Sequence, residues 1–168
     1  MYDYMERTHT QMIIAAVECN HNPDNGRLKE YSPFTFKDPH FGMVPGLGKT
    51  TMEWYVNEFK PYIDANFRTK PGRNNTFIAG SSMGGLMSVY ALIEYNHVFS
   101  RAAALSPSLW TSPMHLKNMI KYATVDPNTV LYMDYGAKEF GNHKNQRRAF
   151  GEIAMLLMWH NIMLDCRI

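Results

Sequence analysis

A strand, a sharp turn and a helix are predicted in direct succession between Thr76 and Leu92. The stretch begins with the short apolar run Thr76–Gly80, and apolar side chains then recur from Leu86 to Ile93 at the spacing of one helix face. The turn between them contains the motif Gly80-x-Ser82-x-Gly84. We interpret this motif as a nucleophile elbow, which occurs where a strand turns directly into a helix.

This elbow makes Ser82 the candidate nucleophile. A serine on so tight a turn lifts its hydroxyl clear of the backbone, and the glycines on either side leave room for the turn. The N-terminus of the following helix favours negative charge. We therefore expect the backbone N–H of Met83 to donate to the oxyanion of an acyl-transfer intermediate.

Composition indicates a single globular domain spanning residues 1–168. The chain is 45% hydrophobic and 19% charged, with a net charge of +2, values typical of globular proteins. No apolar run approaches the roughly 20 residues of a membrane span, and the acidic N-terminus does not resemble a secretory signal. Cys19 and Cys166 are expected to be free thiols. A cytoplasmic protein without a membrane partner is therefore predicted.

Strand-like and helix-like segments alternate along the chain. Strands are predicted at 12–17, 76–80, 100–106, 129–133 and 162–168, and helices at 51–67, 83–95, 114–122 and 146–160. Residues 27–48 are expected to form a long irregular loop, and Pro61 to kink or break its helix. This alternation predicts an α/β fold, a three-layer sandwich around a mostly parallel sheet.

Three loops are expected to converge with Ser82. Sites in parallel sheets lie beyond the carboxyl ends of the strands, and the loops that follow the predicted strands there are His21–Arg27, Ser106–Trp110 and Asp134–His143. Candidate acids, bases and pocket residues are therefore sought in these three loops.

Two other sequence features resemble nucleotide-binding or nucleic-acid-binding sites, but neither supports such a partner. Gly46-Leu47-Gly48-Lys49-Thr50 resembles part of a phosphate-binding loop, but the first glycine of that motif is replaced by Met43 and no strand precedes it. A helix start with Thr50 or Thr51 as N-cap is the preferred interpretation. The densest basic group, Lys144, Arg147 and Arg148, is typical of a solvated helix face.

Several motifs together resemble a known family. They are Arg27-x-x-Glu30-Tyr31-Ser32-Pro33, Glu58-x-x-Pro61-x-Ile63-Asp64-x-x-Phe67-Arg68-Thr69, Ile78-Ala79-Gly80-Ser81-Ser82-Met83-Gly84-Gly85, Phe99-Ser100, Leu105-Ser106-Pro107-Ser108-Leu109-Trp110 and Gly136-x-x-Glu139. The chain resembles the α/β-hydrolase superfamily and, within it, the Putative esterase family. That family includes enterochelin esterases, S-formylglutathione hydrolases, feruloyl and acetylxylan esterases, and mycolyltransferases.

The resemblance implies a serine ester hydrolase that works through an acyl-enzyme, without metal or cofactor, on a small-molecule or carbohydrate-linked ester. Ser82 matches the nucleophile and Met83 supplies one oxyanion N–H. Glu139 matches the acid of the triad, with Asp134 as the second candidate. Trp110 either forms a wall of the substrate pocket or packs in the core; both interpretations stay open.

The resemblance also implies that the α/β-hydrolase domain is truncated at both ends. The family has an earlier strand, whose loop donates the second oxyanion N–H, and a catalytic histidine after the last strand. His143 and His21 are weak candidates for the base, and a non-catalytic module is the alternative function. Exposed sheet edges are expected to cause self-association, so a homo-oligomer is possible.

Overall fold

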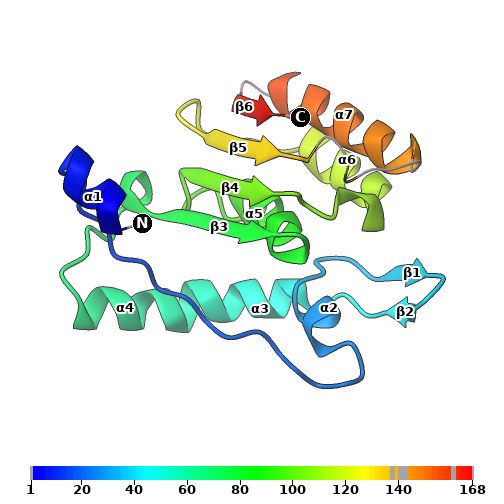
Figure 1. The fold of residues 1–168 in the computed structure, drawn as a ribbon, viewed down its shortest axis with the longest axis horizontal. Coiled ribbons are helices and arrows are strands. Elements are labelled where there is room, and N and C mark those ends of the chain that lie inside the picture. The colour runs from blue at the N-terminus through cyan, green and yellow to red at the C-terminus, as the bar shows by residue number, and fades with distance from the viewer. Residues whose placement is uncertain (1, 137–138, 140–143, 160–161, 168) are drawn as a thin grey trace.

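The computed structural model describes residues 2–136, 139, 144–159 and 162–167. In chain order the helices and strands are α1 (Tyr2–Thr8), α2 (Gly26–Glu30), β1 (Phe36–Asp38), β2 (Gly42–Val44), α3 (Gly48–Trp54), η1 (Tyr55–Phe59), α4 (Lys60–Asn66), η2 (Arg73–Asn75), β3 (Phe77–Ser81), α5 (Met83–Glu94), β4 (Arg101–Leu105), η3 (Leu109–Thr111), α6 (Pro113–Lys121), β5 (Val130–Asp134), α7 (Lys144–Trp159) and β6 (Met163–Arg167). Figure 1 shows their arrangement.

The main sheet is parallel, as the sequence predicts. Its four strands lie in the order β3-β4-β5-β6 (Figure 1), and the register aligns Ala79 with Ala103 and Ala103 with Tyr132. Helices connect successive strands, because parallel neighbours need a crossover. The α/β-hydrolase-like fold class is confirmed, and the predicted strands and helices from residue 76 onward match the observed ones to within about two residues at each end.

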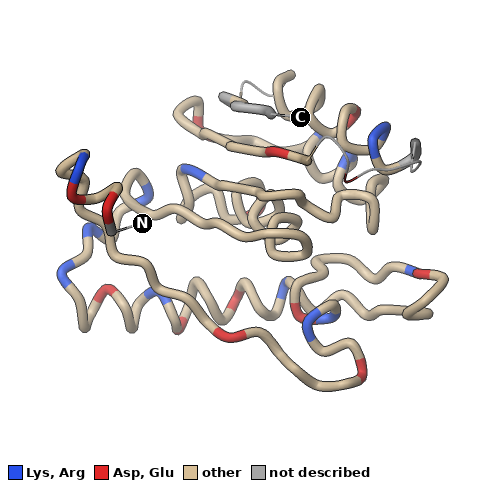
Figure 2. The backbone as a smooth tube through the Cα atoms, in the orientation of Figure 1, with Lys and Arg blue, Asp and Glu red and all other residues tan. Residues whose placement is uncertain are grey.

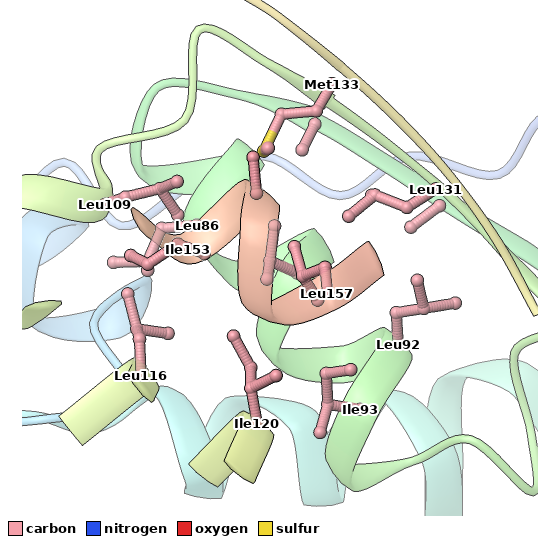
Figure 3. Packing of buried hydrophobic residues seen from close by; sticks show 14 of the residues in the cluster. Leu86, Leu92, Ile93, Leu109, Leu116, Ile120, Leu131, Met133, Ile153 and Leu157 are labelled. Atoms are coloured by element: carbon pink, nitrogen blue, oxygen red, sulfur yellow. The ribbon is translucent and has the colours of Figure 1, made fainter. Parts of the chain in front are cut away.

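One face of this sheet forms the main hydrophobic core. Leu131 and Met133 of β5 are fully buried, and so are Ala104 of β4 and Leu86 of α5. Figure 3 shows such side chains from α5, α6 and α7 pointing toward one another below the strands. The core therefore clamps α5, the helix that follows Ser82, against the sheet.

The continuous helical segment formed by α3, η1 and α4 packs on the outer side of α5. Met52 of α3 belongs to a second buried cluster with Met87 and Tyr90 of α5 and with Phe99. The alternate residues of β4 that point to the other face of the sheet, Arg101 and Leu105, remain exposed. In the described part of the chain, the buried apolar surface is thus concentrated on the α5 side.

Two predictions for the first fifty residues are wrong. Residues 12–17 form no strand; Met12, Ile13 and Ile14 are at least 37% exposed, and Figure 1 draws this segment as an irregular trace. An apolar run becomes a strand only when another backbone supplies a hydrogen-bonding ladder, which this segment lacks here. Cys19, two residues beyond this segment, is a free thiol, as predicted, and is half-buried, while the side chain of Cys166 lies outside the described residues.

The loop predicted at 27–48 is instead partly ordered, with α2 followed by the antiparallel β1–β2 hairpin. Asp38 explains the hairpin turn, because its carboxylate accepts the N–H groups of His40 and Phe41 at 2.8 and 3.1 Å. Periodicity misses this hairpin because each of its strands has only three residues.

Pro61 neither breaks nor ends its helix. The preceding turn, η1, widens to π-helical spacing, and α4 begins with Pro61 in its first turn. A proline lacks an N–H and its ring clashes with the carbonyl four residues earlier, so a wider turn accommodates it. The helix also begins at Gly48, without the side-chain cap predicted at Thr50 or Thr51.

Charges and hydropathy do not single out a surface. Basic and acidic residues are interspersed along the tube in Figure 2, and Arg148 of the basic group pairs with Glu152 at 2.7 Å on α7. Among the helices that the structure describes, none combines the length and the hydropathy needed to cross a bilayer.

Candidate active site

Ser82 lies at the sharp turn between β3 and α5, as predicted. Its backbone has φ 56° and ψ −119°, a combination that a residue with a side chain adopts only under strain and that clusters at functional sites. Its N–H donates to the carbonyl of Leu105 at 2.9 Å, and its carbonyl accepts the N–H of Leu86 at 3.0 Å. The turn is therefore tied both to β4 and to the buried helix.

The two glycines of the motif differ in what they do. A Cβ on Gly80 would lie 2.5 Å from the backbone carbon and oxygen of Gly84, whereas a Cβ on Gly84 would meet nothing within 4 Å. Gly85 is the second tight position, because its Cβ would lie 3.0 Å from Leu105 and Pro107. The turn thus requires Gly80 and constrains Gly85, while Gly84 is not required by space.

The hydroxyl of Ser82 contacts a second serine. Ser82 Oγ and Ser108 Oγ are 3.3 Å apart, and the N–H of Ser108 donates to the Ser82 carbonyl at 3.1 Å. Ser108 is buried and precedes the short helix η3. Sequence reasoning placed this loop near Ser82 but gave Ser108 no role.

Glu139 is held at the same end of the sheet. Its Oε2 accepts the Oγ–H of Ser106 at 2.8 Å and the N–H of Gly136 at 2.8 Å. Its own N–H donates to the Gly136 carbonyl at 2.9 Å. Ser106 and Ser108 flank Pro107, so one segment contacts both the candidate acid and the candidate nucleophile.

Asp134, the second candidate acid, ends β5. Its two carboxylate oxygens accept hydrogen bonds from the N–H of Ser106 at 3.1 Å and the hydroxyl of Tyr132 at 2.9 Å. Each oxygen of Asp134 thus has a donor from a neighbour in the sheet, whereas both hydrogen bonds to the Glu139 carboxylate fall on one oxygen.

Tyr135 separates these two carboxylates along the chain. Burial raises the pKa of its phenol, and the nearby charge of Glu139 adds to the rise against a backbone hydrogen bond from Leu109. Its ring packs edge-on against Phe150 of α7, with the centroids 4.7 Å apart. The phenol therefore stays neutral at physiological pH and anchors the start of the acid loop to the core.

Met83 and Trp110 occupy positions compatible with their predicted roles. Met83 is the first residue of α5, so its N–H belongs to the helix turn that has no intrahelical acceptor. Its side chain is buried. Trp110 lies in η3, two residues beyond Ser108, and is 38% exposed. That exposure favours a surface or pocket-wall position over one deep in the core.

The described histidines do not include an evident partner for Ser82. His21 hydrogen-bonds the carboxylate of Glu18 at 3.0 Å on the surface, and His115 stacks on the ring of Phe34 at 5.0 Å. His143 lies outside the described residues. The identity of a base is thus a question for mutagenesis.

Three amides of the segment Gly46–Thr50 are already engaged within the protein. The N–H groups of Gly46, Leu47 and Gly48 donate to Thr35 Oγ1, the Lys29 carbonyl and the Ser32 carbonyl, respectively, at 2.7–3.1 Å. Both glycines are explained by packing, because a Cβ at either one would meet the backbone of residues 32–35 within 2.8 Å. This supports the rejection of a nucleotide site.

A shallow hollow lies elsewhere, between the loop after residue 19 and the start of α3. Its lining includes Asn20, Asp24, Lys29 and Glu30 and contains neither Ser82 nor Glu139. These polar groups satisfy one another: Lys29 pairs with Asp24 at 2.6 Å, and Glu30 accepts the N–H of Asn20 at 2.6 Å. We therefore regard the hollow as a packing feature rather than a site.

Solved structures with a similar fold are serine hydrolases and esterases. An IroE-like serine hydrolase from Shewanella oneidensis aligns with a TM-score of 0.65 at 22% identity, over 88% of this chain and 50% of that one. The siderophore hydrolase EstA from Aspergillus nidulans aligns at 0.60 and 18% identity, over 84% and 59% of the two chains. The enterobactin esterase FES from Shigella flexneri aligns at 0.59 and 18% identity, over 71% and 33%.

Sequence comparison agrees with this likeness. The uncharacterized protein YbbA of Bacillus subtilis is 24% identical over 139 residues, which are 81% of this chain and 53% of that protein. The chain thus spans about half the length of the curated relative that it matches. The model of one family, described as Putative esterase, matches residues 42–160. Because this match covers most of the chain and contains the Ser82 turn, the chain belongs to the Putative esterase family.

Proposed function

We propose that this chain carries the nucleophile and acid of a serine ester hydrolase. The observation that carries the proposal is the strained Ser82 backbone at the N-terminus of a buried helix. A fold maintains such strain where a reactive group must be presented. Family membership and the likeness to serine hydrolase structures support the same reaction class.

The reaction proceeds through an acyl-enzyme. Ser82 Oγ forms a bond to the ester carbonyl carbon while its proton passes to a general base, and the carbonyl oxygen becomes an oxyanion facing the Met83 N–H. Collapse of this intermediate breaks the bond to the alcohol, which leaves with the proton. Water then attacks in the same way, releasing the carboxylic acid and restoring Ser82.

Glu139 orients and stabilises the charged base in this scheme. A serine hydroxyl is a weak nucleophile without a base, and the weak candidates within this chain are His143, which follows Glu139 by four residues, and His21. The exposed side chains of Trp110 and Leu105, at the carboxyl end of β4, offer apolar surface for a small-molecule ester. The enterobactin and ferulic acid named for the structural neighbours fit this class.

The test is hydrolysis of p-nitrophenyl acetate, together with labelling by a fluorophosphonate. We expect turnover and labelling that disappear in Ser82→Ala, and a large loss of both in Glu139→Gln. His143→Ala and His21→Ala are tested in parallel, and the substitution that abolishes turnover identifies the base. If the parent protein neither hydrolyses the ester nor reacts with the fluorophosphonate, this chain is a non-catalytic module and the proposal is wrong.

A further inference from the structure

We propose that Ser106 is a positioning residue that sets the orientation of the Glu139 carboxylate, so that the acid and the nucleophile keep a fixed relation. This inference rests on the proposed function, because it assigns Glu139 as the acid. It adds a residue for which neither the motif nor the family match gives a role.

The backbone of Ser106 is held in an unusual conformation. Its φ is +43°, in the left-handed region that residues other than glycine rarely adopt. The N–H of Ser106 donates to both the carbonyl and the Oδ1 of Asp134, each at 3.1 Å. Leu105, its neighbour, pairs with Asp134 in the sheet. The end of β4 is thus bent and fastened to the end of β5, which directs the Ser106 side chain to the acid loop.

The hydroxyl of Ser106 selects one oxygen of Glu139. Oε2 accepts both the Ser106 hydroxyl and the Gly136 N–H, each at 2.8 Å. Among the hydrogen bonds of the described residues, none involves Oε1. A carboxylate has two equivalent oxygens, so two donors on Oε2 fix the plane of the group and leave Oε1 to accept the N–H of a base. Gly136 alone permits rotation about the Gly136–Oε2 hydrogen bond.

The same segment also controls the nucleophile. Pro107 separates Ser106 from Ser108 and restricts the backbone between them, and Ser108 contacts Ser82 Oγ at 3.3 Å. Gly85 of α5 packs tightly against Pro107. A displacement of Ser106 is therefore transmitted to both catalytic groups, and strained residues of this kind cluster at functional sites.

Ser106→Gly is the test variant. Glycine adopts φ +43° without strain, so this substitution removes the hydroxyl and keeps the bend. Ser100→Ala is the matched control: it removes a buried hydroxyl next to β4 that has no hydrogen-bond partner in the described residues. Each change is also made in a Glu139→Gln background, so that a double-mutant cycle isolates the coupling of Ser106 to the acid.

Two quantities are measured: the kinetics of p-nitrophenyl acetate hydrolysis and the exchange rate of the Gly136 amide by NMR. We expect Ser106→Gly to lower kcat about 10- to 100-fold at constant KM, because a small misplacement of a catalytic group has effects of this size. We expect the Gly136 amide to exchange faster as well. Ser100→Ala leaves both unchanged, and Ser106→Gly has no further effect on kcat once Glu139 is glutamine.

Unchanged kcat in Ser106→Gly would overturn the inference while the proposed function stands. An equal loss in the Glu139 and Glu139→Gln backgrounds would also overturn it, because Ser106 would then act independently of the acid. Unchanged exchange of the Gly136 amide would show that the hydroxyl does not hold the carboxylate. A parent protein whose Ser82 does not react at all refutes the proposed function, and this role with it.

Discussion

Replacement of Gly80 or Gly84 by alanine tests whether the turn requires a glycine at each of these two motif positions for steric reasons. In Gly80→Ala, the new methyl would lie 2.5 Å from the backbone carbon and oxygen of Gly84. Backbone atoms clamped by a buried helix cannot rotate away as a flexible side chain can, so β3 and α5 must separate at the turn. Overpacking of this kind destabilises by about 1–3 kcal/mol, which lowers Tm by roughly 2–12 °C in a domain of this size.

Gly84→Ala is the matched comparison. Its methyl would enter open space, and Gly84 lies in the first turn of α5, where alanine is the better helix former. We expect stability that is unchanged or raised by up to about 1 kcal/mol. The two variants carry the same chemical change in the same motif, so their difference reports only the local packing.

Thermal unfolding by circular dichroism and urea titration measure both variants, and fluorophosphonate labelling reports whether the turn still presents Ser82. We expect Gly80→Ala to lose stability and labelling together, and Gly84→Ala to retain both. Equal destabilisation by the two substitutions would refute the reasoning. It would mean that the motif needs both glycines for a reason other than the space around each Cβ.

Three further predictions concern stability. Arg73→Met removes the donor to the backbone carbonyl of Asn96, which has no other donor among the hydrogen bonds of the described residues; an acceptor left unsatisfied costs about 1–3 kcal/mol, and urea titration should show a loss of at least 1 kcal/mol. Leu131→Ala opens a cavity at the centre of the core and should cost about 2–5 kcal/mol; a smaller loss would contradict the packing in Figure 3. Burial acts to raise the pKa of Asp64, but hydrogen bonds from Lys60 and Thr69 lower it overall. The stabilisation that results is present above the unfolded pKa near 4 and is lost as the pH falls through the lower folded pKa, so Asp64→Asn should lose less stability than the parent between about pH 4 and pH 2.

The local sequence predicted secondary structure correctly wherever one segment contains the whole residue pattern of its strand, turn or helix. The apolar strand, the glycine-containing turn and the helical spacing after Ser82 are encoded within about fifteen residues, and the structure confirms all three. The same holds for β4, β5 and α7, whose apolar patterns are long enough to identify. The alternation of these segments predicted the parallel sheet, because successive parallel strands need a helical crossover.

Local sequence failed where the outcome depends on a partner from elsewhere in the chain. Residues 12–17 have the composition of a buried strand and form none, since a strand exists only beside another backbone. Pro61 is accommodated by a π-helical turn, whose Tyr55 and Val56 pack against a cluster that includes residues of α5. The roles of Gly80 and Gly84 differ because only one of them faces a neighbouring backbone atom.

The same distinction between local pattern and tertiary contact applies to the residues of the candidate site. The sequence motif predicted Ser82 as the nucleophile, and the resemblance to the family implied Glu139 as the acid, with Asp134 as the second candidate. Only the tertiary structure revealed that Ser106 and Ser108 contact Glu139 and Ser82, respectively. The contact between Ser106 and Glu139 spans 33 positions of the chain, and the contact between Ser108 and Ser82 spans 26. Both arise from the register of β3, β4 and β5. A hydrogen bond of this kind depends on distances across the sheet, which no local pattern of residue types encodes.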